Sequence, residues 1–297
     1  MKIDFSMIVV NGQPFCSLNL ESIYPFANRI IIIEGPVSRY RQMGIGTSND
    51  GTLEAIKNFP DPEHKIILES SLEWEEKDDM VHAQEKWFSP DADWLWAVDA
   101  DEFYHHDDMC KVINWLESHP NCYSMSFHFC SFYGGLTNLR TVGGFESKVE
   151  NFRLQRLSPN AKWRTHRPPS MIWAPNGKLC REMGHTDGTK ELGVRIFHFA
   201  YQPPMRVQYK TQYYQSWSIS VMPDYFNKVY VPWMKAKTDE ERFIVEKRFN
   251  GVQEFHPEVR GSAYTMPFTG KLPDIIERER TKIETQIQEQ LKALGIC

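Results

Sequence analysis

The sequence predicts an α/β fold with a mostly parallel, doubly wound sheet, and three observations indicate it. In roughly the first 100 residues, short apolar runs alternate with segments whose apolar residues recur at helical spacing. The run Arg29–Ile33 is continuous and β-branched, which is typical of a strand buried on both faces. Turn residues close such runs, as in Asn11-Gly12-Gln13-Pro14. Because the crossovers of such a sheet are right-handed, its parallel strands all end at one edge.

The first third of the chain contains these alternating elements in order. Each expected strand is short and apolar, and each expected helix repeats its apolar residues every three or four positions. We expect strands at Phe5–Val10, Arg29–Ile33, Lys65–Leu68 and Trp94–Val98, and helices at Leu18–Phe26, Leu53–Phe59 and Asp78–Phe88.

The middle of the chain predicts an acceptor-side α+β region. Met109–Leu116 indicates a helix, whereas Tyr123–Cys130, Glu150–Leu157 and Arg195–Tyr201 alternate as strands do. We interpret Lys162–Pro169 as a basic surface loop, with a sugar-binding platform of base, aromatic ring and cation as the alternative.

The last part of the chain predicts helices. Asp239–Phe249 has acids early and bases late, and a stripe of apolar residues follows at helical spacing. For that stripe we favour packing on the domain over packing on a second subunit. The expected organisation is a first half of one domain at 1–105, a second half of the same domain at 106–235 and a helical extension at 236–297. The stripe consists of Ile276, Ile283, Ile287, Leu291 and Leu294.

Composition excludes several classes of protein. The chain has 297 residues, is 41% hydrophobic and carries a net charge of −5, so we expect a sizeable core and no general nucleic-acid binder. No apolar stretch is long enough to span a bilayer, and the N-terminus lacks a signal-peptide core. The six cysteines are scattered without CxxC spacing, which indicates reduced thiols and a cytoplasmic location.

The stretch Asp93–Phe103 carries the clearest chemical signal. Trp94–Val98 is a short apolar run that leads directly into three carboxylates, Asp99, Asp101 and Glu102. A buried strand with this ending places the acids at the carboxyl edge of the sheet, where ligands of open α/β sheets bind. Two converging carboxylates repel each other unless a cation lies between them, and such oxygen ligands favour Mg²⁺ or Mn²⁺. The alternative is an acidic turn after a core strand.

Four motifs taken in order resemble the nucleotide-sugar domain of family 2-type glycosyltransferases of the GT-A fold. They are Asn11-Gly-Gln-Pro, Glu34-Gly, Ser48-Asn-Asp-Gly-Thr52 and the run from Ala92 to Phe103 with Asp99-Ala100-Asp101. The resemblance covers roughly the first 105 residues, and it implies that 1–105 is the nucleotide-sugar-binding half of the domain and 106–235 its acceptor-binding half. Two departures stand out: Gly12 occupies a position where the family often has Glu, and about a dozen residues separate Glu34 from the Ser48 turn. A later stretch, Arg195–Tyr201 followed by Lys210, resembles the family's His-Tyr strand and the helix after it.

The resemblance implies a set of donor-binding residues. Glu34, and with it Asp50, would contact the nucleobase, and Asn11 would lie at the same pocket. Asp99 and Ala100 would face the ribose or a metal-bound water, and Asp101 would hold the metal. For each of these residues the alternative is an ordinary turn or surface role.

Downstream residues complete the expected site. The resemblance implies that His198 is a third metal ligand, with a core position between two phenylalanines as the alternative and His185 as runner-up. Arg206 and Lys210, one helical turn apart, are candidates for neutralising the diphosphate. An inverting enzyme also needs a base near the acceptor hydroxyl. We name Glu102, His166 and Asp187 as catalytic candidates, and Glu146, Glu182 and His185 stay open beside them.

The sequence therefore predicts a metal-dependent glycosyltransferase that uses Mn²⁺ or Mg²⁺ and moves a hexosyl or related sugar. The donor would be a nucleoside-diphosphate sugar, and the acceptor a glycan or another hydroxyl compound. Two alternatives remain: a phosphohydrolase of the haloacid-dehalogenase type, and a non-catalytic carbohydrate-binding protein with a degenerate transferase fold. The identity of the donor and acceptor, the stereochemistry and the oligomeric state are open.

Overall fold

The computed structural model of the protein describes residues 1–141, 149–217, 222–252 and 263–296. Two compact units make up the chain: one combines Met1–His128 with Val149–Ile196, and the other combines Phe129–Lys148 with Phe197–Cys297. Each unit is thus assembled from two separate stretches, and the three segments expected from the sequence stay a prediction. Glu146, one of the base candidates, lies outside the described residues.

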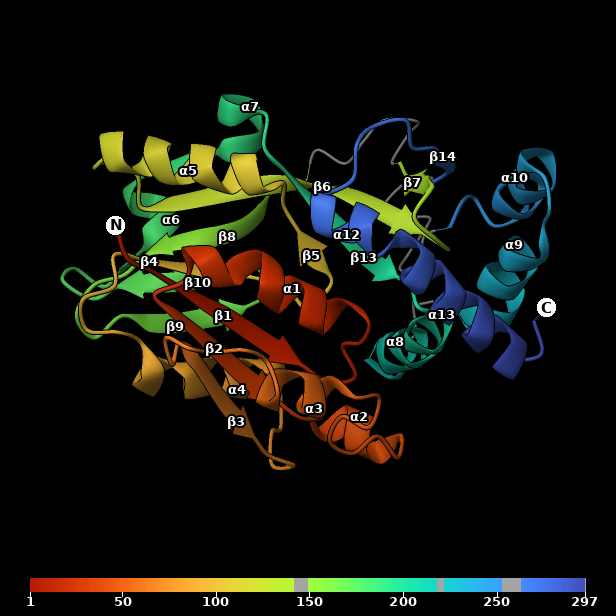
Figure 1. Ribbon diagram of the computed structural model, residues 1–297, viewed down its shortest axis with the longest axis horizontal. Coiled ribbons are helices and arrows are strands. Elements are labelled where there is room, and N and C mark those ends of the chain that lie inside the picture. Colours follow the sequence, from red (N-terminus) through yellow and green to blue (C-terminus); the bar gives the residue numbers. More distant parts are fainter. Residues whose placement is uncertain (142–148, 218–221, 253–262, 297) are drawn as a thin grey trace. The chain divides into compact units, whose positions relative to one another are not determined.

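A mostly parallel sheet forms the centre of the first unit and confirms the predicted α/β class (Figure 1). Its order is β3-β2-β1-β4-β8-β6, and β12 pairs with β6. All of these strands run in one direction except β8, which is antiparallel to both β4 and β6. The strands are β1 (Ile3–Val9), β2 (Arg29–Glu34), β3 (Ile66–Ser70), β4 (Trp94–Ala97), β6 (Ser124–Tyr133), β8 (Asn151–Arg156) and β12 (His185–Asp187), and the short β5 (Glu102–Phe103) follows β4.

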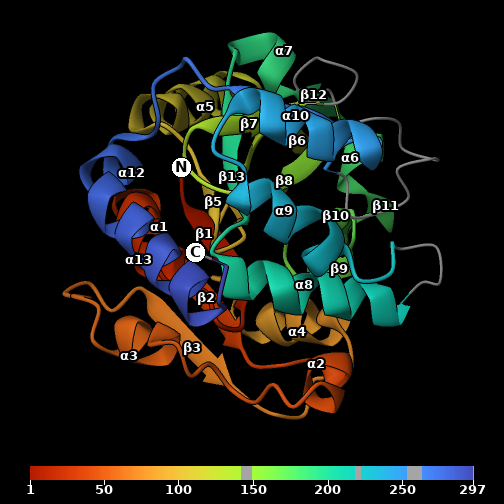
Figure 2. The same ribbon diagram turned by 90° about the vertical axis from the view of Figure 1, so that its right-hand side faces the viewer.

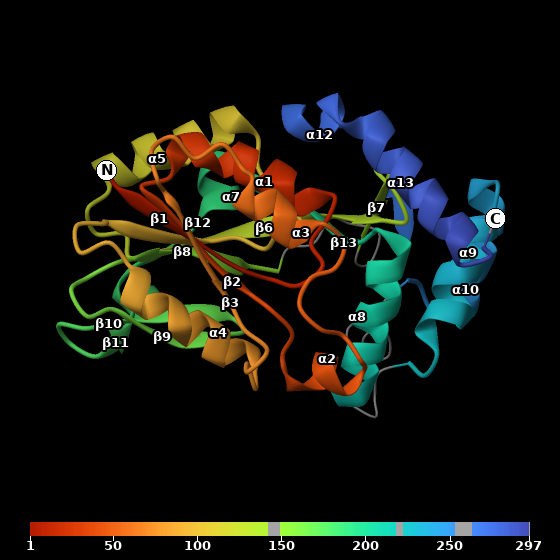
Figure 3. The same ribbon diagram turned by 60° about the horizontal axis from the view of Figure 1, so that its bottom comes forward.

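Helices cover both faces of this sheet. Figures 1 and 3 show α1 and α5 on one face and α4 on the other. The expected order of strands and helices in the first third is confirmed, with boundaries shifted by a few residues. The helices are α1 (Phe15–Ile23), α2 (Ser38–Gln42), α3 (Thr52–Lys57), α4 (Lys77–Gln84), α5 (His106–Ser118), α6 (Cys180–Met183) and α7 (Gly188–Leu192), with 3-10 turns η1 (Tyr24–Phe26) and η2 (Glu85–Trp87).

The core of the first unit lies where β1, β4 and β6 face α1 and α5. Ile30–Ile33 are fully buried, as a strand covered on both faces requires. The ring of Trp96 stacks between those of Phe5 and Phe127, at centroid distances of 5.5 and 6.1 Å. Its indole nitrogen donates to the hydroxyl of Tyr104 at 3.2 Å, so a buried polar group is paired. This packing fixes the position of β4, the strand that leads into the Asp99–Asp101 turn.

A small second sheet lies against α4, where the sequence had indicated a basic surface loop. The segment Lys162–Pro169 instead contributes to a three-stranded antiparallel sheet, so the surface-loop interpretation is wrong. The reason is that side chains of a strand alternate between its two faces. Trp163 and Met171 point into a buried cluster with Val81 and Leu95, while the charged residues between them face outward. The strands are β9 (Lys162–His166), β10 (Pro169–Trp173) and β11 (Lys178–Leu179).

The second unit combines three further strands with helices. β13 and β7 both pair with β6, and β14 pairs with β7. Figure 2 shows α9 between α10 and α8. The elements are β7 (Asn138–Arg140), β13 (Arg195–Tyr201), β14 (Thr265–Pro267), α8 (Pro204–Trp217), the π-helical turn η3 (Phe226–Tyr230), α9 (Val231–Lys235), α10 (Asp239–Arg248), α12 (Asp274–Arg278) and α13 (Arg280–Ala293).

The C-terminal apolar stripe packs within the second unit, as expected. It is divided between two helices, because the chain leaves helical geometry at Glu279 between α12 and α13. Ile283, Ile287 and Leu291 are buried, and α13 packs on α8. Among the described residues no disulfide forms, and none of the helices there has the length and apolar character that crossing a membrane requires.

Candidate active site

The candidate site lies in the first unit, at the carboxyl ends of three parallel strands. β1 pairs in parallel with β2 and with β4, and the last residue of β1, Val9, is in register with Glu34 at the end of β2. Asn11 follows β1, and Asp99 follows the end of β4 by two residues. The structure thus brings the first three sequence-predicted positions to one edge, where open α/β sheets bind ligands.

Hydrogen bonds join the loop after β1 to the Ser48–Thr52 turn. The backbone N–H of Asn11 donates to the Ser48 hydroxyl at 2.9 Å, and the N–H of Asn49 donates to the Asn11 side chain at 3.0 Å. The N–H of Gly12 donates to the Thr52 hydroxyl at 2.8 Å. The two loops therefore form one ordered surface, although 37 residues separate Asn11 from Ser48.

The carboxylate of Asp50 accepts hydrogen bonds from both loops of this surface. Its Oδ2 accepts from the N–H of Gln13 at 2.8 Å, and its Oδ1 accepts from the N–H and the hydroxyl of Thr52 at 3.1 and 2.6 Å. The dozen residues between Glu34 and the Ser48–Thr52 turn include α2 and return the chain to the sheet edge. Asp50 therefore lies next to the loop after β1 despite this long spacing, and both of its carboxylate oxygens accept hydrogen bonds that hold the turn.

Glu34 is fully buried beneath the same turn. Its Oε1 accepts from the N–H of Ser48 at 2.7 Å, and its Oε2 accepts from the hydroxyl of Ser70. The carboxylate is thus an internal anchor that connects the end of β2 to the turn and to β3. A role in reading a nucleobase stays a prediction.

We expect Glu34→Ala to weaken nucleotide binding and to lower stability together. A buried N–H left without a partner costs about 1–3 kcal/mol, and the turn that it anchors would loosen. Calorimetry with UDP and GDP and thermal melting measure the two effects. Glu54→Ala, at an exposed position on α3, is the matched control and should change neither. Unchanged nucleotide affinity in the Glu34 variant would contradict the expectation.

The Asp99–Asp101 turn packs directly on the loop after β1. A Cβ atom at Gly12 would lie 3.3 Å from the Cβ of Ala100 and 2.7 Å from a methyl of Val9, which explains why this position has no side chain. The amide of Asn19 on α1 donates to the carbonyl oxygen of Asp99 at 3.4 Å. The side chain of Asp99 keeps 38% exposure, whereas Asp101 is only 3% exposed. The carboxylate that this turn offers to solvent is therefore that of Asp99.

Arg153 on β8 forms a buried ion pair with Glu102. Its Nε donates to Oε2 at 2.7 Å, its Nη2 donates to Oε1, and Nη2 also lies 3.5 Å from Oδ2 of Asp99. Burial acts to lower the pKa of Arg153, but Glu102 outweighs it and raises that pKa above its usual range, so the guanidinium stays charged. The side chain of Glu102 has no exposed surface, so an acceptor hydroxyl could not reach it to give up a proton.

A small pocket lies beside Asp99 in the first unit. Its walls come from β1, β4, β8, α4 and the β9–β10 hairpin. His166 is part of this wall, and burial together with Lys77 and nearby arginines lowers its pKa to about 3. The imidazole is therefore neutral at neutral pH and a weak base. The polar residues of the lining are Ser6, Gln84, Asp99, Arg153, Trp163 and His166.

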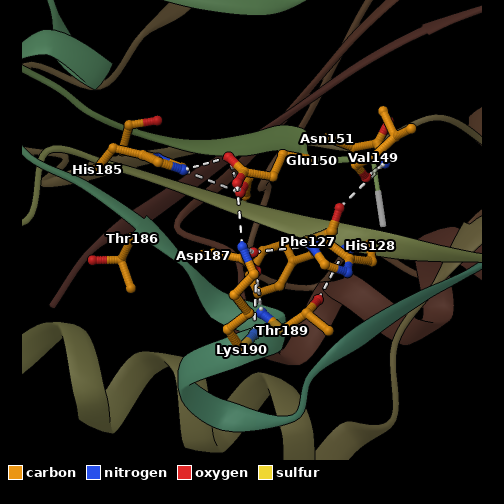
Figure 4. A network of polar contacts seen from close by, with 12 residues as sticks. Phe127, His128, Val149, Glu150, Asn151, His185, Thr186, Asp187, Thr189 and Lys190 are labelled. Atoms are coloured by element: carbon orange, nitrogen blue, oxygen red, sulfur yellow. Dashed lines mark hydrogen bonds and ion pairs between the residues drawn. The ribbon is translucent and has the colours of Figure 1, made fainter. Parts of the chain in front are cut away.

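A second group of ionisable residues lies at the same edge, around β6 and β12, which lie beyond β8 in the sheet. Asp187 ends β12, and its Oδ2 lies 3.0 Å from Nε2 of His128 and 2.9 Å from Nζ of Lys190. Nε2 of His185 lies 2.9 Å from Oε2 of Glu150, the residue before β8. Figure 4 shows these side chains meeting in one network. Because β12, β6 and β4 run in the same direction, this network and Asp99 share one edge of the sheet.

Asp187 is the member of this network whose ionisation is best defined. Its Oδ1 caps α7 by accepting from the N–H groups of Thr189 and Lys190, at 3.1 and 3.2 Å. Burial acts to raise the pKa of Asp187, but the hydrogen bonds from Lys190 and the adjacent His128 outweigh it, so the pKa lies below its usual range. Asp187 is therefore an ionised proton acceptor at neutral pH.

The remaining candidates belong to the second unit. His198 lies on β13 as expected, with its ring 4.3 Å from that of Phe129. Arg206 and Lys210 lie on α8, and the ammonium of Lys210 sits 5.1 Å from the ring centroid of Tyr201. Their roles at a metal or a diphosphate stay predictions.

Sequence reasoning missed Arg153, His128 and Gln84. Trp163 belongs to the stretch Lys162–Pro169, for which a sugar-binding platform was the alternative expectation. One signal was available for Arg153. It occupies the alternate position of a buried strand, between Phe152 and Leu154, where a charge requires a partner. Gln84 and His128 lie within an expected helix and an expected strand, and nothing in their local sequence distinguishes them from packing residues.

A scan against protein-family models and a search of curated proteins find no match. Solved structures with partial similarity include a mannosyltransferase from Pyrobaculum calidifontis in complex with GDP-mannose and Mn²⁺, at 16% identity and a TM-score of 0.34. That match covers 42% of this chain and 35% of the other.

Two further solved structures show the same level of similarity. S. aureus TarS matches at 15% identity and a TM-score of 0.31, over 44% of this chain and 22% of its own. Glucosyl-3-phosphoglycerate synthase from Mycobacterium tuberculosis, in complex with Mn²⁺, UDP and glucosyl-3-phosphoglycerate, matches at 14% identity and a TM-score of 0.31, over 44% of each chain. Each match spans less than half of the solved chain, and TM-scores at this level carry no argument about function.

Proposed function

We propose that this chain is a glycosyltransferase of the GT-A type, which moves a sugar from a nucleoside-diphosphate donor to a hydroxyl acceptor. The observation that supports this proposal best is the convergence at one sheet edge. The Asp99-Ala100-Asp101 turn packs against a loop surface built from the ends of β1 and β2 and the Ser48–Thr52 turn. Such an edge is where ligands of open α/β sheets bind.

In this proposal the loop surface receives the nucleoside. Asn11 and Asp50 hold the loops in place, and Glu34 supports them from below, so the surface is ordered before the donor arrives. Asp99 and Ala100 would then lie next to the ribose and the diphosphate. Arg206 and Lys210 of the second unit remain our candidates for neutralising the diphosphate.

The residues of the turn fit a hard divalent cation. Asp99 offers a partly exposed carboxylate, and oxygen donors suit Mg²⁺ and Mn²⁺; Asp101, which is only 3% exposed, stays the proposed second ligand. Within the residues that the structure describes, no three His, Cys, Asp or Glu side chains form a complete metal cluster, so we expect donor phosphates and water to supply further ligands. A bound ion would stabilise the negative charge that develops on the leaving diphosphate. His198 stays the proposed third protein ligand.

Among the three catalytic candidates we favour Asp187. Glu102 is bound by the buried Arg153 and has no exposed side-chain surface, and His166 lies in the wall of the pocket beside Asp99, where the proposal places the donor. Asp187 is ionised, held in one orientation by the start of α7, and lies at the same sheet edge as Asp99. We assign it the role of accepting the proton of the acceptor hydroxyl.

A donor screen tests the proposal directly. The protein would be incubated with UDP-glucose, UDP-galactose, UDP-N-acetylglucosamine, GDP-mannose and dTDP-glucose in the presence of Mn²⁺, with a panel of sugar acceptors. Mass spectrometry would then detect a transferred or hydrolysed sugar. Binding of glycans without binding of any nucleotide would instead favour the carbohydrate-binding alternative.

Metal removal gives a second expected result. We expect EDTA to abolish activity and Mn²⁺ to restore it, because the charge of the leaving group would lose its stabilisation. Asp99→Asn and Asp101→Asn should each raise the Mn²⁺ concentration needed for half-maximal activity and weaken diphosphate binding, with the fold unchanged by circular dichroism. Asp107→Asn, at an exposed position on α5, is the control. Full turnover by the metal-stripped protein would rule out the metal-dependent mechanism.

No observation favours the two alternatives. The Asp99-Ala100-Asp101 motif follows β4, whereas the phosphohydrolase alternative usually carries its motif on the first strand. A cytoplasmic location belongs to the proposal as well, and it rests on the scattered cysteines of the sequence.

A further inference from the structure

The pocket beside Asp99 contains buried polar atoms that lack partners. It lies between the central sheet, α4 and the β9–β10 hairpin, and all of its lining belongs to the first unit. Ile8, Val81 and Pro169 supply apolar walls, and Asp99 marks the side that solvent reaches. Buried polar groups in folded proteins are nearly always paired, so each exception in this pocket needs a reason.

Gln84 on α4 is the first exception. It is fully buried, and its Nε2 donates to the carbonyl oxygens of Met7 and Ile31 at 3.1 and 3.5 Å. These two carbonyls determine the orientation of the amide, because the opposite orientation would place Oε1 against two other oxygens. Oε1 is therefore left as a buried acceptor without a hydrogen-bond partner, on a residue that lines the pocket.

Trp163 on β9 is the second exception. It is 4% exposed, lines the same pocket, and its indole N–H is buried without an acceptor. Two other buried tryptophans are paired: Trp96 donates to Tyr104, and Trp233 donates to Glu246. The pocket thus has one unpaired acceptor and one unpaired donor, which together match a hydroxyl group, since a hydroxyl both donates and accepts.

The hairpin that carries Trp163 is held firmly in place. Two residues of α4, at positions 78 and 82, and Glu85 directly after that helix anchor it. The N–H of Trp163 donates to Glu85 at 2.7 Å, His82 lies 3.3 Å from the carbonyl oxygen of Trp163, and the N–H of His166 donates to Asp78 at 2.7 Å. The donor of Trp163 and the acceptor of Gln84 are therefore fixed relative to each other before any ligand binds.

We propose that this pocket takes a hydroxyl-bearing arm of the sugar that is transferred, and that Gln84 and Trp163 determine which sugar is accepted. This inference rests on the proposed function, because it places the sugar next to Asp99 at the diphosphate. The small size of the pocket suits one hydroxyl or hydroxymethyl arm, with the rest of the ring outside it. A site built to bond a hydroxyl discriminates strongly against an analogue that lacks it.

The test uses Trp163→Phe, which deletes the N–H and keeps an aromatic ring. Because that N–H has no partner in the protein, the melting temperature should change little. Affinity would be measured by calorimetry for the nucleotide sugar that the wild type binds best in the donor screen, and for its parent nucleoside diphosphate. We expect roughly tenfold weaker binding of the nucleotide sugar and unchanged binding of the diphosphate, as loss of one hydrogen bond to a ligand predicts.

A second measurement uses the counterpart of that sugar that lacks the hydroxymethyl arm, on the same nucleotide, such as UDP-xylose beside UDP-glucose. Wild type should bind the analogue more weakly than the full sugar, and Trp163→Phe should show a smaller difference between the two, because only the Gln84 contact to the hydroxyl is left. Trp173→Phe, the same change in the same hairpin but outside the pocket lining, is the matched control and should behave as wild type.

Two outcomes overturn the inference and are distinguishable. If Trp163→Phe binds sugar and diphosphate as wild type does, the pocket holds only water and the proposed function stands. If the wild type binds no nucleoside diphosphate and no nucleotide sugar, the proposed function fails and this inference fails with it.

Discussion

Replacing Asp187 by Asn should reduce the turnover number by roughly 10²–10⁴-fold, the range that a positioned general base contributes. Asn has nearly the same shape and is a good N-cap, so it can still accept the N–H groups of Thr189 and Lys190 at the start of α7. The substitution removes the charge that accepts a proton while the local backbone stays in place. We therefore expect the melting temperature to fall by far less than the activity.

The pH dependence gives an independent readout for Asp187. Lys190 and His128 hold its pKa below the usual range, so the carboxylate loses its proton at a lower pH than an ordinary aspartate does. Activity that depends on the ionised form should thus persist as the pH falls to about 4, where an ordinary aspartate would be half protonated. The acidic limb of the pH–rate profile should disappear in the Asn variant.

Glu191→Gln is the matched control for Asp187→Asn. It removes one carboxylate from the same helix, at an exposed position that is not part of the network. The control should keep wild-type turnover. If Asp187→Asn also keeps it, Asp187 is only a helix cap, and the network of His185 and Glu150 becomes the next place to search for the base.

The parts of the fold that were predictable from sequence are those specified by local patterns. The run Ile30–Ile33 and the run from Trp94 could be recognised as buried strands because their apolar side chains are consecutive. The meeting of Glu34 and Asp99 at one edge followed from the parallel order of β1, β2 and β4. The β9–β10 hairpin was missed because its charged residues alternate with Trp163 over a stretch too short for the alternation to indicate a strand.

The details of the candidate site depend on contacts between residues far apart in the chain. From the sequence, Glu102 was interpreted as a catalytic candidate next to Asp99 and Asp101. In the fold it pairs with Arg153, which lies 51 residues away in the chain. Glu34 read as a nucleobase ligand, yet it anchors Ser48 and Ser70. In both cases the residue type and position were visible, whereas the tertiary partner that determines its chemistry was not.

Arg153→Met should be the most destabilising of the substitutions considered. The change removes one partner of a buried ion pair and leaves Glu102, whose side chain has no exposed surface, as an uncompensated buried charge. Breaking such a pair typically costs about 3–5 kcal/mol. Urea unfolding would measure the loss as a lower midpoint at unchanged slope.

The double variant Arg153→Met, Glu102→Leu distinguishes the stability that the ion pair contributes from the cost of leaving one of its charges buried without a partner. Replacing both partners of a buried pair with apolar side chains of similar volume is often neutral, so we expect the double variant to recover most of the lost stability. A double variant as unstable as Arg153→Met would show that the arginine stabilises the fold through packing of its stem, and that the pairing with Glu102 contributes little.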